Sequence, residues 1–432
     1  MSKARMLCLV REHKGATVIF VAIAMVMLLG FAALAVDLGY LYVVRGELQN
    51  AADSGALAGA QVLYDDPTTP SDVPGAQVYA GANTIAQNYV VQNYSEKTQV
   101  TVESIERGHW SFATRTFTPN DSLTPVDLWD VTTEELDANT AFINAVRVKT
   151  RRKRDLGGNL PSNFFAKIFG DSRAEVKATA VAYIGFAGRL EPFAVDQPIA
   201  ICQQAILSQA GAYTCGVGRM LNSGQNAGHQ TAGWTNFSQP CETASANSVR
   251  PFVCATGNTQ FLELGQTLGT TNGTVQTVYD GITDCWYANA AFDRDGNGIP
   301  DLPWPMVLPV IDCPGGAVSN CSDLVGAVKV NVVWITRNDK NQMNEVPRRM
   351  GDWPPEGSPL RDPVTLSCTG SGLECWNSFV DYFNLKDILN NTDAFYEDKT
   401  LYFHPDCNAH EPTGVTGGKN FGILAKIPVL VK

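Results

Sequence analysis

The longest hydrophobic stretch of the chain lies close to its beginning. Gly15–Val36 is a run of 22 residues that contains no charged side chain. A helix of that length measures about 33 Å, which matches the hydrocarbon core of a lipid bilayer. The pattern therefore predicts a transmembrane helix over residues 15–36.

The helical pattern does not stop at the end of this run. Apolar residues continue at helical spacing, with polar residues between them, at Leu38, Leu41, Val44, Leu48, Ala51, Ala52 and Ala56. We therefore expect the membrane helix to extend outward as an amphipathic stalk over residues 37–64. Asp65-Asp66-Pro67 should end it, because proline cannot continue the hydrogen-bond ladder and disfavours a helical residue before it.

Small residues crowd the outer part of this predicted stalk. They are Ala51, Ala52, Ser54, Gly55, Ala56, Ala58, Gly59 and Ala60. Small side chains let another backbone approach closely. Two interpretations stay open: the helix lies on its own domain, or it associates with helices of other subunits.

Residues 65–188 combine helical and strand patterns. Residues 65–75 are rich in Pro, Thr, Ser and Asp, which indicates a linker. The periodicity then predicts helices over Ala76–Tyr94 and Pro161–Phe169, strands over Gln99–Ile105, Trp110–Phe117, Asn144–Arg154 and Arg173–Gly185, a turn at Gly108 and a loop over residues 118–140. These elements predict a small α+β domain.

The composition changes over residues 189–432, where cysteines appear and Gly, Asn, Thr and Pro become more frequent. Ala327–Ile335 and Ile423–Val431 are expected to be strands, and Trp376–Asn384 a short helix. We therefore predict a β-rich domain with long loops. The fold class of the whole chain is predicted to be α+β.

Ten of the eleven cysteines lie in this last part, and Cys8 stands alone near the N-terminus. An even set in one region predicts disulfides formed in an oxidising compartment. The short loops Cys313–Cys321 and Cys368–Cys375 are the first pairs to expect. The chain contains no Cys-x-x-Cys, so the spacing for thiol–disulfide exchange and for a zinc ribbon is missing.

Charge predicts the orientation of the chain in the membrane. Residues 1–14 carry four bases and one acid, a net +3, whereas the whole chain is −11 and the remainder therefore −14. Because positive charge stays in the cytoplasm, residues 1–14 are predicted to be a cytoplasmic tip and the rest exported. The alternative is a signal peptide cut near Ala33-Leu34-Ala35, but the apolar run exceeds the usual 7–15 residues.

Several segments resemble a known family. They are Gly15–Val18, Gly30–Gly39 and Glu47–Ala60, followed more weakly by Gly108-His109-Trp110, Asn144–Val148, Phe164–Gly170 and Val176–Ala182. Together they resemble the N-terminal region of TadG-like (Tad-domain) proteins, which belong to the tight-adherence machinery that assembles Flp pili in bacteria. The resemblance extends to about Gly188.

This resemblance implies a single-pass protein of the bacterial inner membrane with a periplasmic or extracellular body. The implied function is a structural component of Tad/Flp pilus assembly and adherence, which acts by docking and scaffolding and not as an enzyme. Its partners would be the inner membrane and Tad apparatus proteins or pilus subunits, with self-association through the small-residue helix as a further option. The alternatives are a surface adhesin or minor pilus-tip protein and, third, a membrane-anchored hydrolase.

Two departures from related proteins limit these implications. The Asp-x-Ser-x-Ser string of a von Willebrand A-type metal site is missing. Type IV pilins are cut after a glycine and use a glutamate five residues later, but the fifth residue after Gly15 is Phe20. Processing and polymerisation as a pilin are therefore not expected.

Residues 293–301 carry the sharpest chemical signal. Side-chain oxygens of Asp293, Asp295, Asn297 and Asp301, with a backbone carbonyl near Ile299, follow the alternation of a calcium loop. Trp304 stands where an EF-hand has its last glutamate, so Asp284 or water would complete the ligand set. We predict a structural Ca²⁺ site, and the alternative is a turn stabilised by its own Asp and Asn side chains.

Two other clusters of polar residues could carry chemistry. Arg147, Lys149 and Arg151–Arg154 form a basic run, which indicates either a patch for anionic lipid, polysaccharide or an acidic partner, or a solvated strand face. Nucleic acid is not expected as a partner, because the exported part is strongly acidic. His404, Cys407 and His410 could bind zinc, but Cys407 belongs to the even cysteine set and is expected to be oxidised. No catalytic motif was found, and no catalytic residue is predicted.

Overall fold

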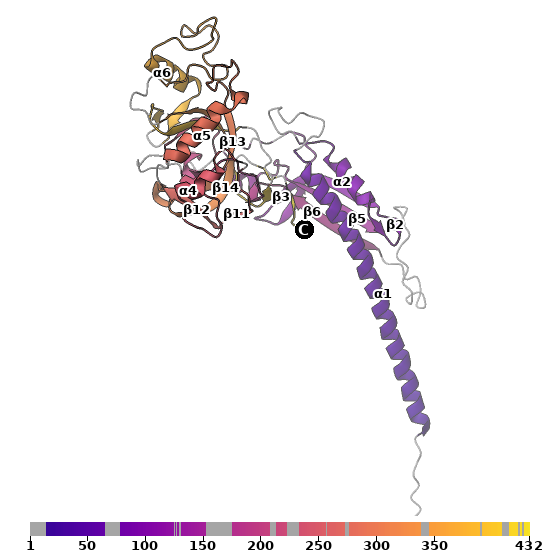
Figure 1. Ribbon diagram of the computed structural model, residues 1–432. Helices are drawn as coiled ribbons and strands as arrows, with labels where there is room; N and C mark the ends of the chain where they lie inside the picture. Colours follow the sequence, from indigo (N-terminus) through magenta and orange to yellow (C-terminus); the bar gives the residue numbers. More distant parts are fainter. Residues whose placement is uncertain are drawn as a thin grey trace, which may run out of the picture.

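The computed structural model describes most of the chain. The described residues are 14–64, 78–152 (except 125, 127, 129 and 130), 175–207, 213–222, 233–255, 257–272, 276–337, 345–388, 391–407, 414–421, 424–425 and 427–432. The predicted linker over residues 65–75 and the predicted helix Pro161–Phe169 lie outside them. Figure 1 shows a long helix that projects from the body of the molecule.

Helix α1 runs without a break over Lys14–Gln61, a length of 48 residues. It begins one residue before the predicted membrane segment, spans all of it and continues through most of the predicted stalk. Side chains of residues 17–32 are all exposed, whereas Val44, Leu48, Ala52 and Ala56 have no exposed surface. The continuous helix is confirmed, and it has one bare half and one packed half.

The packed half of α1 lies on a five-stranded antiparallel sheet together with a second helix. The strand order is β19-β6-β5-β3-β4. The elements are α2 (Ala82–Val91), β3 (Val102–Ser111), β4 (Thr116–Pro119), β5 (Ala145–Arg152), β6 (Val176–Tyr183) and β19 (Val429–Leu430), with a small hairpin of β1 (Tyr94–Ser95) and β2 (Thr98–Gln99) beside them. We call residues 37–188 with β19 the proximal domain.

Alternation along the strands determines which side chains meet the helix. Val146 and Val148 of β5 and the alanines of β6 pack under Leu48 and Ala52. The Thr150 hydroxyl donates to the Leu48 carbonyl of α1 at 3.0 Å, and the Gln49 amide donates to Thr179 of β6 at 3.2 Å. Strands β5 and β6 therefore agree with the two predicted valine- and alanine-rich strands.

The small residues of α1 serve packing within the chain. A Cβ atom on Gly55 would lie 2.3 Å from a methyl group of Val90 and 2.9 Å from the Ala86 carbonyl oxygen of α2. Gly59 is similarly close to Ala86. Ala51, Ala52, Ala56 and Ala60 are fully buried against the same domain. The interpretation that the helix lies on its own domain is confirmed.

Three local predictions in the proximal domain are wrong. Gly108 does not form a turn but lies inside β3, where a Cβ atom would approach the Thr118 carbonyl oxygen of β4 to 2.2 Å. The hairpin therefore turns after Ser111. The predicted loop over residues 118–140 contains helix α3 (Thr133–Ala138), whose first turn is stabilised by a capping box of Thr132 and Glu135. Helix α2 begins only at Ala82, six residues later than predicted for Ala76–Tyr94.

Residues 189–425 form a second part, here called the distal body, around a nine-stranded mixed sheet. The strand order is β12-β10-β8-β13-β14-β17-β9-β15-β16, and β12 also pairs with β14, so the first five strands form a closed ring. The strands are β8 (Ile199–Cys202), β9 (Gly218–Asn222), β10 (Gly233–Thr235), β12 (Thr267–Asn272), β13 (Trp304–Ile311), β14 (Cys321–Ile335), β15 (Leu385–Asp387), β16 (Thr392–Asp393) and β17 (Thr400–Pro405).

Short helices and an aromatic core complete the distal body. The helices are α4 (Ala246–Val249), α5 (Gln276–Ala288) and α6 (Gly372–Tyr382), with 3₁₀ turns η3 (Gln203–Ala205), η4 (Arg250–Phe252), η5 (Ala290–Phe292) and η6 (Pro314–Gly316). Trp234, Trp286 and Trp353 are almost fully buried. The predicted strand Ala327–Ile335 and helix Trp376–Asn384 are found in β14 and α6, and the α+β fold class is confirmed.

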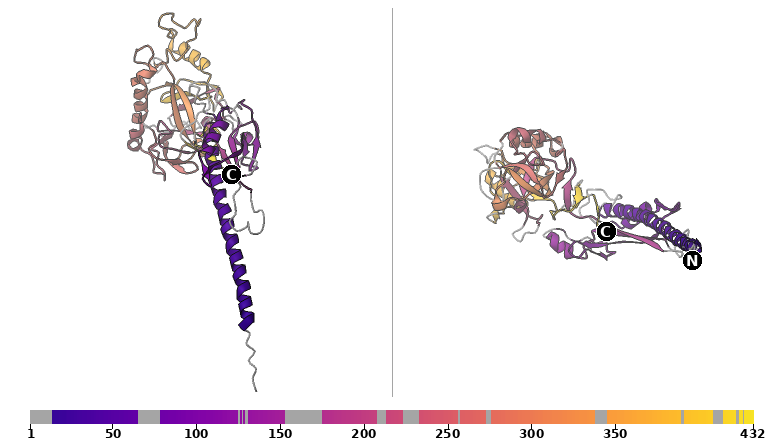
Figure 2. Two further views of the ribbon diagram at one scale, coloured as in Figure 1. Left: turned by 90° about the vertical axis from the view of Figure 1, so that its right-hand side faces the viewer. Right: turned by 90° about the horizontal axis from the view of Figure 1, so that it is seen from below.

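The end of the chain returns from the distal body to the proximal domain. A small sheet of β11 (Leu262–Glu263), β7 (Ala187–Leu190) and β18 (Gly414–Thr416) lies at the junction, and β19 then pairs with β6. Ile423–Val431 is predicted as one strand, but among the described residues of this range only Val429–Leu430 is a strand. Figure 2 shows the C-terminus beside the proximal sheet and the distal body beyond it. The division of the chain after residue 188 stays a prediction.

Five disulfides cross-link the distal body. They join Cys202 to Cys313, Cys215 to Cys407, Cys241 to Cys321, Cys254 to Cys285 and Cys368 to Cys375. The predicted Cys368–Cys375 pair is confirmed, but the Cys313–Cys321 pair is wrong. Cys313 is buried and follows β13 next to β8, whereas Cys321 is exposed and pairs with Gly269 of β12. The two sulfurs therefore face different neighbours.

Candidate functional site

The predicted calcium loop lies between η5 and β13, at the surface of the distal body. The Asp293 carboxylate accepts backbone N–H groups of Gly296, Asn297 and Gly298 at 2.7, 3.1 and 2.7 Å. Hydrogen bonds from Gly298, and then from Gly296 and Asn297, lower the pKa of Asp293. The Asn297 side chain accepts the N–H of Ile299 at 2.7 Å. The loop is thus a tight turn in which side-chain oxygens already bind the backbone.

The other two acids of the loop share a cation from the chain itself. A guanidinium nitrogen of Arg349 lies 3.3 Å from Asp295 and 3.3 Å from Asp301, and Asp301 is only 3% exposed. Asp284, considered as a further ligand, pairs instead with Arg337 at 3.3 Å. Within the described residues, no group of three or more Asp, Glu, His or Cys side chains is arranged for a metal ion. Calcium binding therefore stays a prediction.

The possible zinc cluster is not assembled. Cys407 is bonded to Cys215, so it offers no thiolate, and the zinc hypothesis is wrong. His404 lies on β17 against the ring of Phe383, with ring centroids 6.0 Å apart, and burial lowers its pKa. His410 lies outside the described residues.

The basic run follows the outer face of β5 and is paired with acids. Arg147 and Lys149 both contact Glu106, at 2.8 and 3.2 Å, and Arg151 pairs with Glu103 and Glu175. Burial raises the pKa of Glu106, but its hydrogen bonds to Arg147 and Lys149 lower the pKa by more than burial raises it. The pKa of Glu106 therefore lies below its usual value.

Arg152 alternates to the inner side of β5, where it is 3% exposed and donates to the carbonyl oxygens of Ser95 and Thr98. Lys153 and Arg154 lie outside the described residues. The described part of the run is thus a paired strand face.

Helix α1 carries the most unusual surface of the molecule. Val18, Phe20, Leu28 and Phe31 are 68–72% exposed, and Asp37 is the first buried side chain of the helix. Among the described residues, α1 is the one helix that is long and apolar enough to cross a membrane, and none of its most apolar window is buried. This arrangement fits a single-pass membrane protein.

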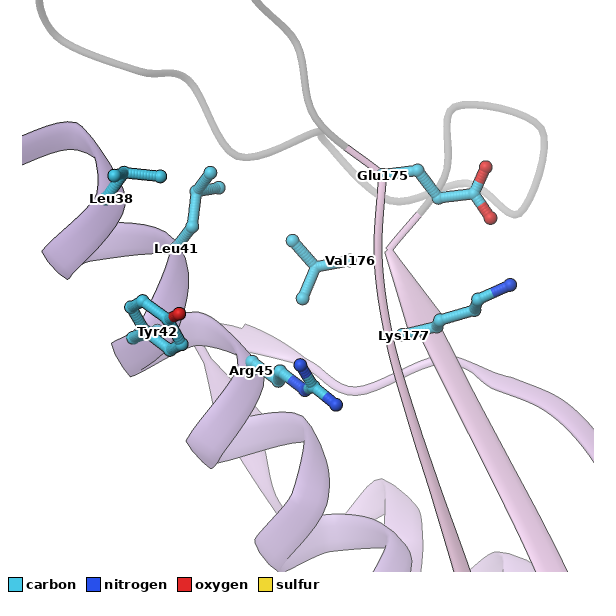
Figure 3. A pocket seen from close by; sticks show the side chains of 7 residues that line it. All are labelled: Leu38, Leu41, Tyr42, Arg45, Glu175, Val176 and Lys177. Atoms are coloured by element: carbon cyan, nitrogen blue, oxygen red, sulfur yellow. The ribbon is translucent and has the colours of Figure 1, made fainter. Parts of the chain in front are cut away.

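A pocket of about 360 Å³ lies where the bare half of α1 meets the domain. Its lining residues are Leu38, Leu41, Tyr42 and Arg45 from α1, and Glu175, Val176 and Lys177 from the start of β6. Figure 3 shows Val176 pointing toward the helix and the Arg45 guanidinium pointing toward the strand, whereas Glu175 and Lys177 point away.

The sequence patterns did not single out this pocket. Leu38 and Leu41 marked only a helix face, and their neighbours on β6 lie more than a hundred residues away in the chain. Periodicity places residues on a face of one element but does not tell which distant strand lies opposite.

A long helix with an exposed apolar half, packed on a small antiparallel sheet, fits the class of single-pass membrane proteins. Comparison with family models narrows this class: residues 15–62 match the Flp pilus-assembly TadE/G-like family, and residues 58–182 match the Tad-like Flp pilus-assembly family. Residues 15–182 thus carry the domains of TadG-like Flp pilus-assembly proteins. No curated protein and no solved structure matches the chain.

Proposed function

We propose that this chain is a membrane-anchored docking component of the Flp pilus-assembly machinery. One observation carries the proposal: residues 17–32 of α1 form a bare apolar rod, although from Val44 onward one face of the same helix is buried against the proximal domain. A helix that is apolar all round is stable only when lipid or other apolar helices cover it. The family assignment to pilus assembly supports both the setting and the role.

Charge and cysteine chemistry support the orientation. The net +3 of residues 1–14 favours a cytoplasmic N-terminus in the inner membrane. The five disulfides of the distal body favour an oxidising compartment on the other side. The body would then lie in the periplasm or outside the cell, tethered by α1.

The arrangement of the two parts supports the proposed docking role. Packed α1 residues support the proximal sheet, and the distal body stands at the end of the molecule remote from the bare half of α1 (Figure 1). Five disulfides hold this body in one shape. We propose that it presents a fixed surface to Tad apparatus proteins or pilus subunits, and that its action is binding without bond-making chemistry.

The native cysteines allow a direct test of this topology. Cys8 lies on the predicted cytoplasmic side, and the other ten cysteines are bonded in pairs. A membrane-impermeant maleimide should therefore label the protein in lysed cells but not in intact spheroplasts. Cys8→Ser should abolish the signal, and Arg115→Cys on the proximal domain should be labelled in intact spheroplasts. Labelling of Cys8 in intact spheroplasts would refute the orientation.

A second candidate is a minor pilus-tip protein or adhesin. It is favoured by the same bare helix, since apolar helices of pilus subunits could cover it in place of lipid, and by the remote position of the distal body. Fractionation separates the two candidates. Retention in the inner membrane after shearing supports docking, and recovery with sheared pili supports the tip protein. The third interpretation, an anchored hydrolase, stays untested.

A further inference from the structure

The pocket beside the bare half of α1 combines an apolar floor with two cationic side chains, of which Lys177 points away from the helix and Arg45 points toward β6 (Figure 3). Leu38, Leu41 and Val176 supply the apolar part, and Tyr42 and Arg45 supply a hydroxyl and a guanidinium. Leu38 is 47% exposed and Tyr42 is 71% exposed, so the pocket opens to the surroundings of the helix. Such a pairing suits a molecule with a hydrocarbon chain and an anionic head.

Arg45 differs from the neighbouring cations of the proximal domain. Arg147 and Arg151 are neutralised by Glu106, Glu103 and Glu175. Arg45 makes no ion pair with any residue that the structure describes. Glu175 also lines the pocket, but its carboxylate faces away and is bound by Arg151. Within the described part of the chain, the guanidinium therefore has no carboxylate partner beside the apolar floor.

The position of the pocket along α1 identifies its surroundings. Taking Val36 as the end of the span, Leu38 to Tyr42 lie about 3 to 9 Å further along the helix and Arg45 about 14 Å. The headgroup layer on one side of a bilayer is about 5 to 8 Å thick. Helical side chains lean toward the N-terminus, which is the membrane side here, so the long Arg45 side chain can reach back into that layer.

From this placement we infer that the pocket binds an anionic phospholipid of the outer leaflet of the inner membrane. The acyl chain lies along Leu38, Leu41 and Val176, in continuity with the bare helix below. The phosphate accepts hydrogen bonds from Arg45 and from the Tyr42 hydroxyl. The lipid would fill the gap between α1 and the start of β6 and so fix the angle at which the helix leaves the membrane. This inference rests on the membrane anchoring proposed above.

Native mass spectrometry of the detergent-solubilised full chain tests this inference. Phosphatidylglycerol should be retained more strongly than phosphatidylcholine. Arg45→Gln should lower phosphatidylglycerol retention about fivefold, which is the expected contribution of one basic residue near an anionic surface. Arg45→Lys should keep most of it. Arg115→Gln removes the same charge from an exposed turn of the proximal domain and should leave retention unchanged.

A second pair of variants tests the apolar part of the pocket. Leu38→Ser should weaken retention, whereas Val43→Ser, on an exposed helix position that does not line the pocket, should not. Equal retention by wild type and Arg45→Gln, or equal retention of both lipids, would overturn the inference while the protein still fractionates with membranes. Displacement by free glycerol phosphate would overturn it too, because the site would then take a soluble anion. Loss of membrane association altogether would instead refute the proposed function.

Discussion

The proximal domain and the distal body stabilise themselves in different ways. The proximal domain contains no cysteine and depends on close packing of α1 against α2 and the sheet, with glycine and alanine at the contacts. Apart from β13 and β14, the distal body has short strands; it also has long connections and an aromatic core, and five disulfides tie it together. The difference teaches that α1 is stabilised by close packing of its backbone against a complementary surface, whereas the loop-rich distal body is stabilised by covalent links between distant segments.

The junction between the two parts depends on side chains from the returning C-terminal segment. The Asn420 amide donates to the carbonyl oxygens of Leu128 and Val131, both at 2.8 Å, and its backbone N–H donates to the Thr133 hydroxyl at 2.7 Å. Lys432 accepts the N–H of Val181 at 2.8 Å. The proximal domain and the distal body are therefore held together by specific hydrogen bonds at the junction.

The largest expected effect is that of reduction. Removing a native disulfide from an extracytoplasmic domain typically costs about 2 to 5 kcal/mol. Reduction of all five should therefore unfold the distal body but leave the cysteine-free proximal domain helical. Near-ultraviolet circular dichroism should lose the signal of the buried tryptophans, while far-ultraviolet helical signal largely persists. An unchanged tryptophan signal after complete reduction would contradict the claim that the disulfides stabilise the distal body.

Glycine substitutions on α1 test the packing of the proximal domain. Gly55→Ala places a Cβ atom 2.3 Å from Val90, so it should destabilise the domain by about 1 to 3 kcal/mol. Gly46→Ala has no atom within 4 Å of the new methyl group and should stabilise the helix by about 0.5 to 1 kcal/mol. Hydrogen exchange of β5 and β6 would measure both. If the two variants behave alike, tight packing at Gly55 is not what holds α1.

Asn420→Ala tests the junction. It leaves the Leu128 and Val131 carbonyl oxygens without their partner, at a cost of about 1 to 3 kcal/mol. Limited proteolysis should then cut faster around residues 128–133. Asn93→Ala removes an exposed amide that bonds to Tyr89 and serves as the control. Equal cleavage rates in both variants and the wild type would mean that the contact contributes little to the junction.

Acid should weaken the proximal domain through Glu106. Its pKa is lower in the folded than in the unfolded protein, so the unfolded chain binds more protons and stability falls as the pH drops below about 4.5 and through the folded pKa. The effect is small because the ion pairs are partly exposed. Glu106→Gln should flatten this part of the stability profile in acid titrations followed by hydrogen exchange. If the stability of Glu106→Gln falls with decreasing pH as steeply as that of the wild type, Glu106 is not a source of the acid sensitivity.

The smallest expected effect concerns the loop over residues 293–301. If it binds calcium, isothermal titration should show heat at millimolar calcium, and Asp293→Asn should abolish it. Arg349→Gln should strengthen binding, because Asp295 and Asp301 lose their internal cation. The absence of heat in the wild type and in Arg349→Gln would leave a turn stabilised by its own side chains.

Much of the proximal domain could be predicted from the sequence because its elements follow strong periodicity. The long helix and strands β5 and β6 appear as regular apolar patterns, and the small residues of α1 correctly indicated close packing. Gly108 was misjudged because a glycine that permits close strand approach looks the same in sequence as one in a turn.

Contacts between distant segments could not be predicted in the same way. Cys202 and Cys313 are 111 residues apart, and the loop length that favoured Cys313–Cys321 says nothing about which strands lie side by side. The pocket at Arg45 and the pairing of β19 with β6 could not be predicted for the same reason, because each depends on contacts between segments that are far apart in the chain. The predicted calcium ligands lie together in one turn because they are local, but the partner of two of them, Arg349, comes from a remote segment.

The central claim is that α1 tethers a folded, disulfide-bonded body to the membrane, and alkaline carbonate extraction tests it most directly. Membranes that contain the full chain should be washed at high pH and separated by ultracentrifugation, with detergent as the positive control for release. The account predicts that the intact chain stays in the membrane pellet until detergent is added. Recovery of the intact chain in the carbonate supernatant would contradict it.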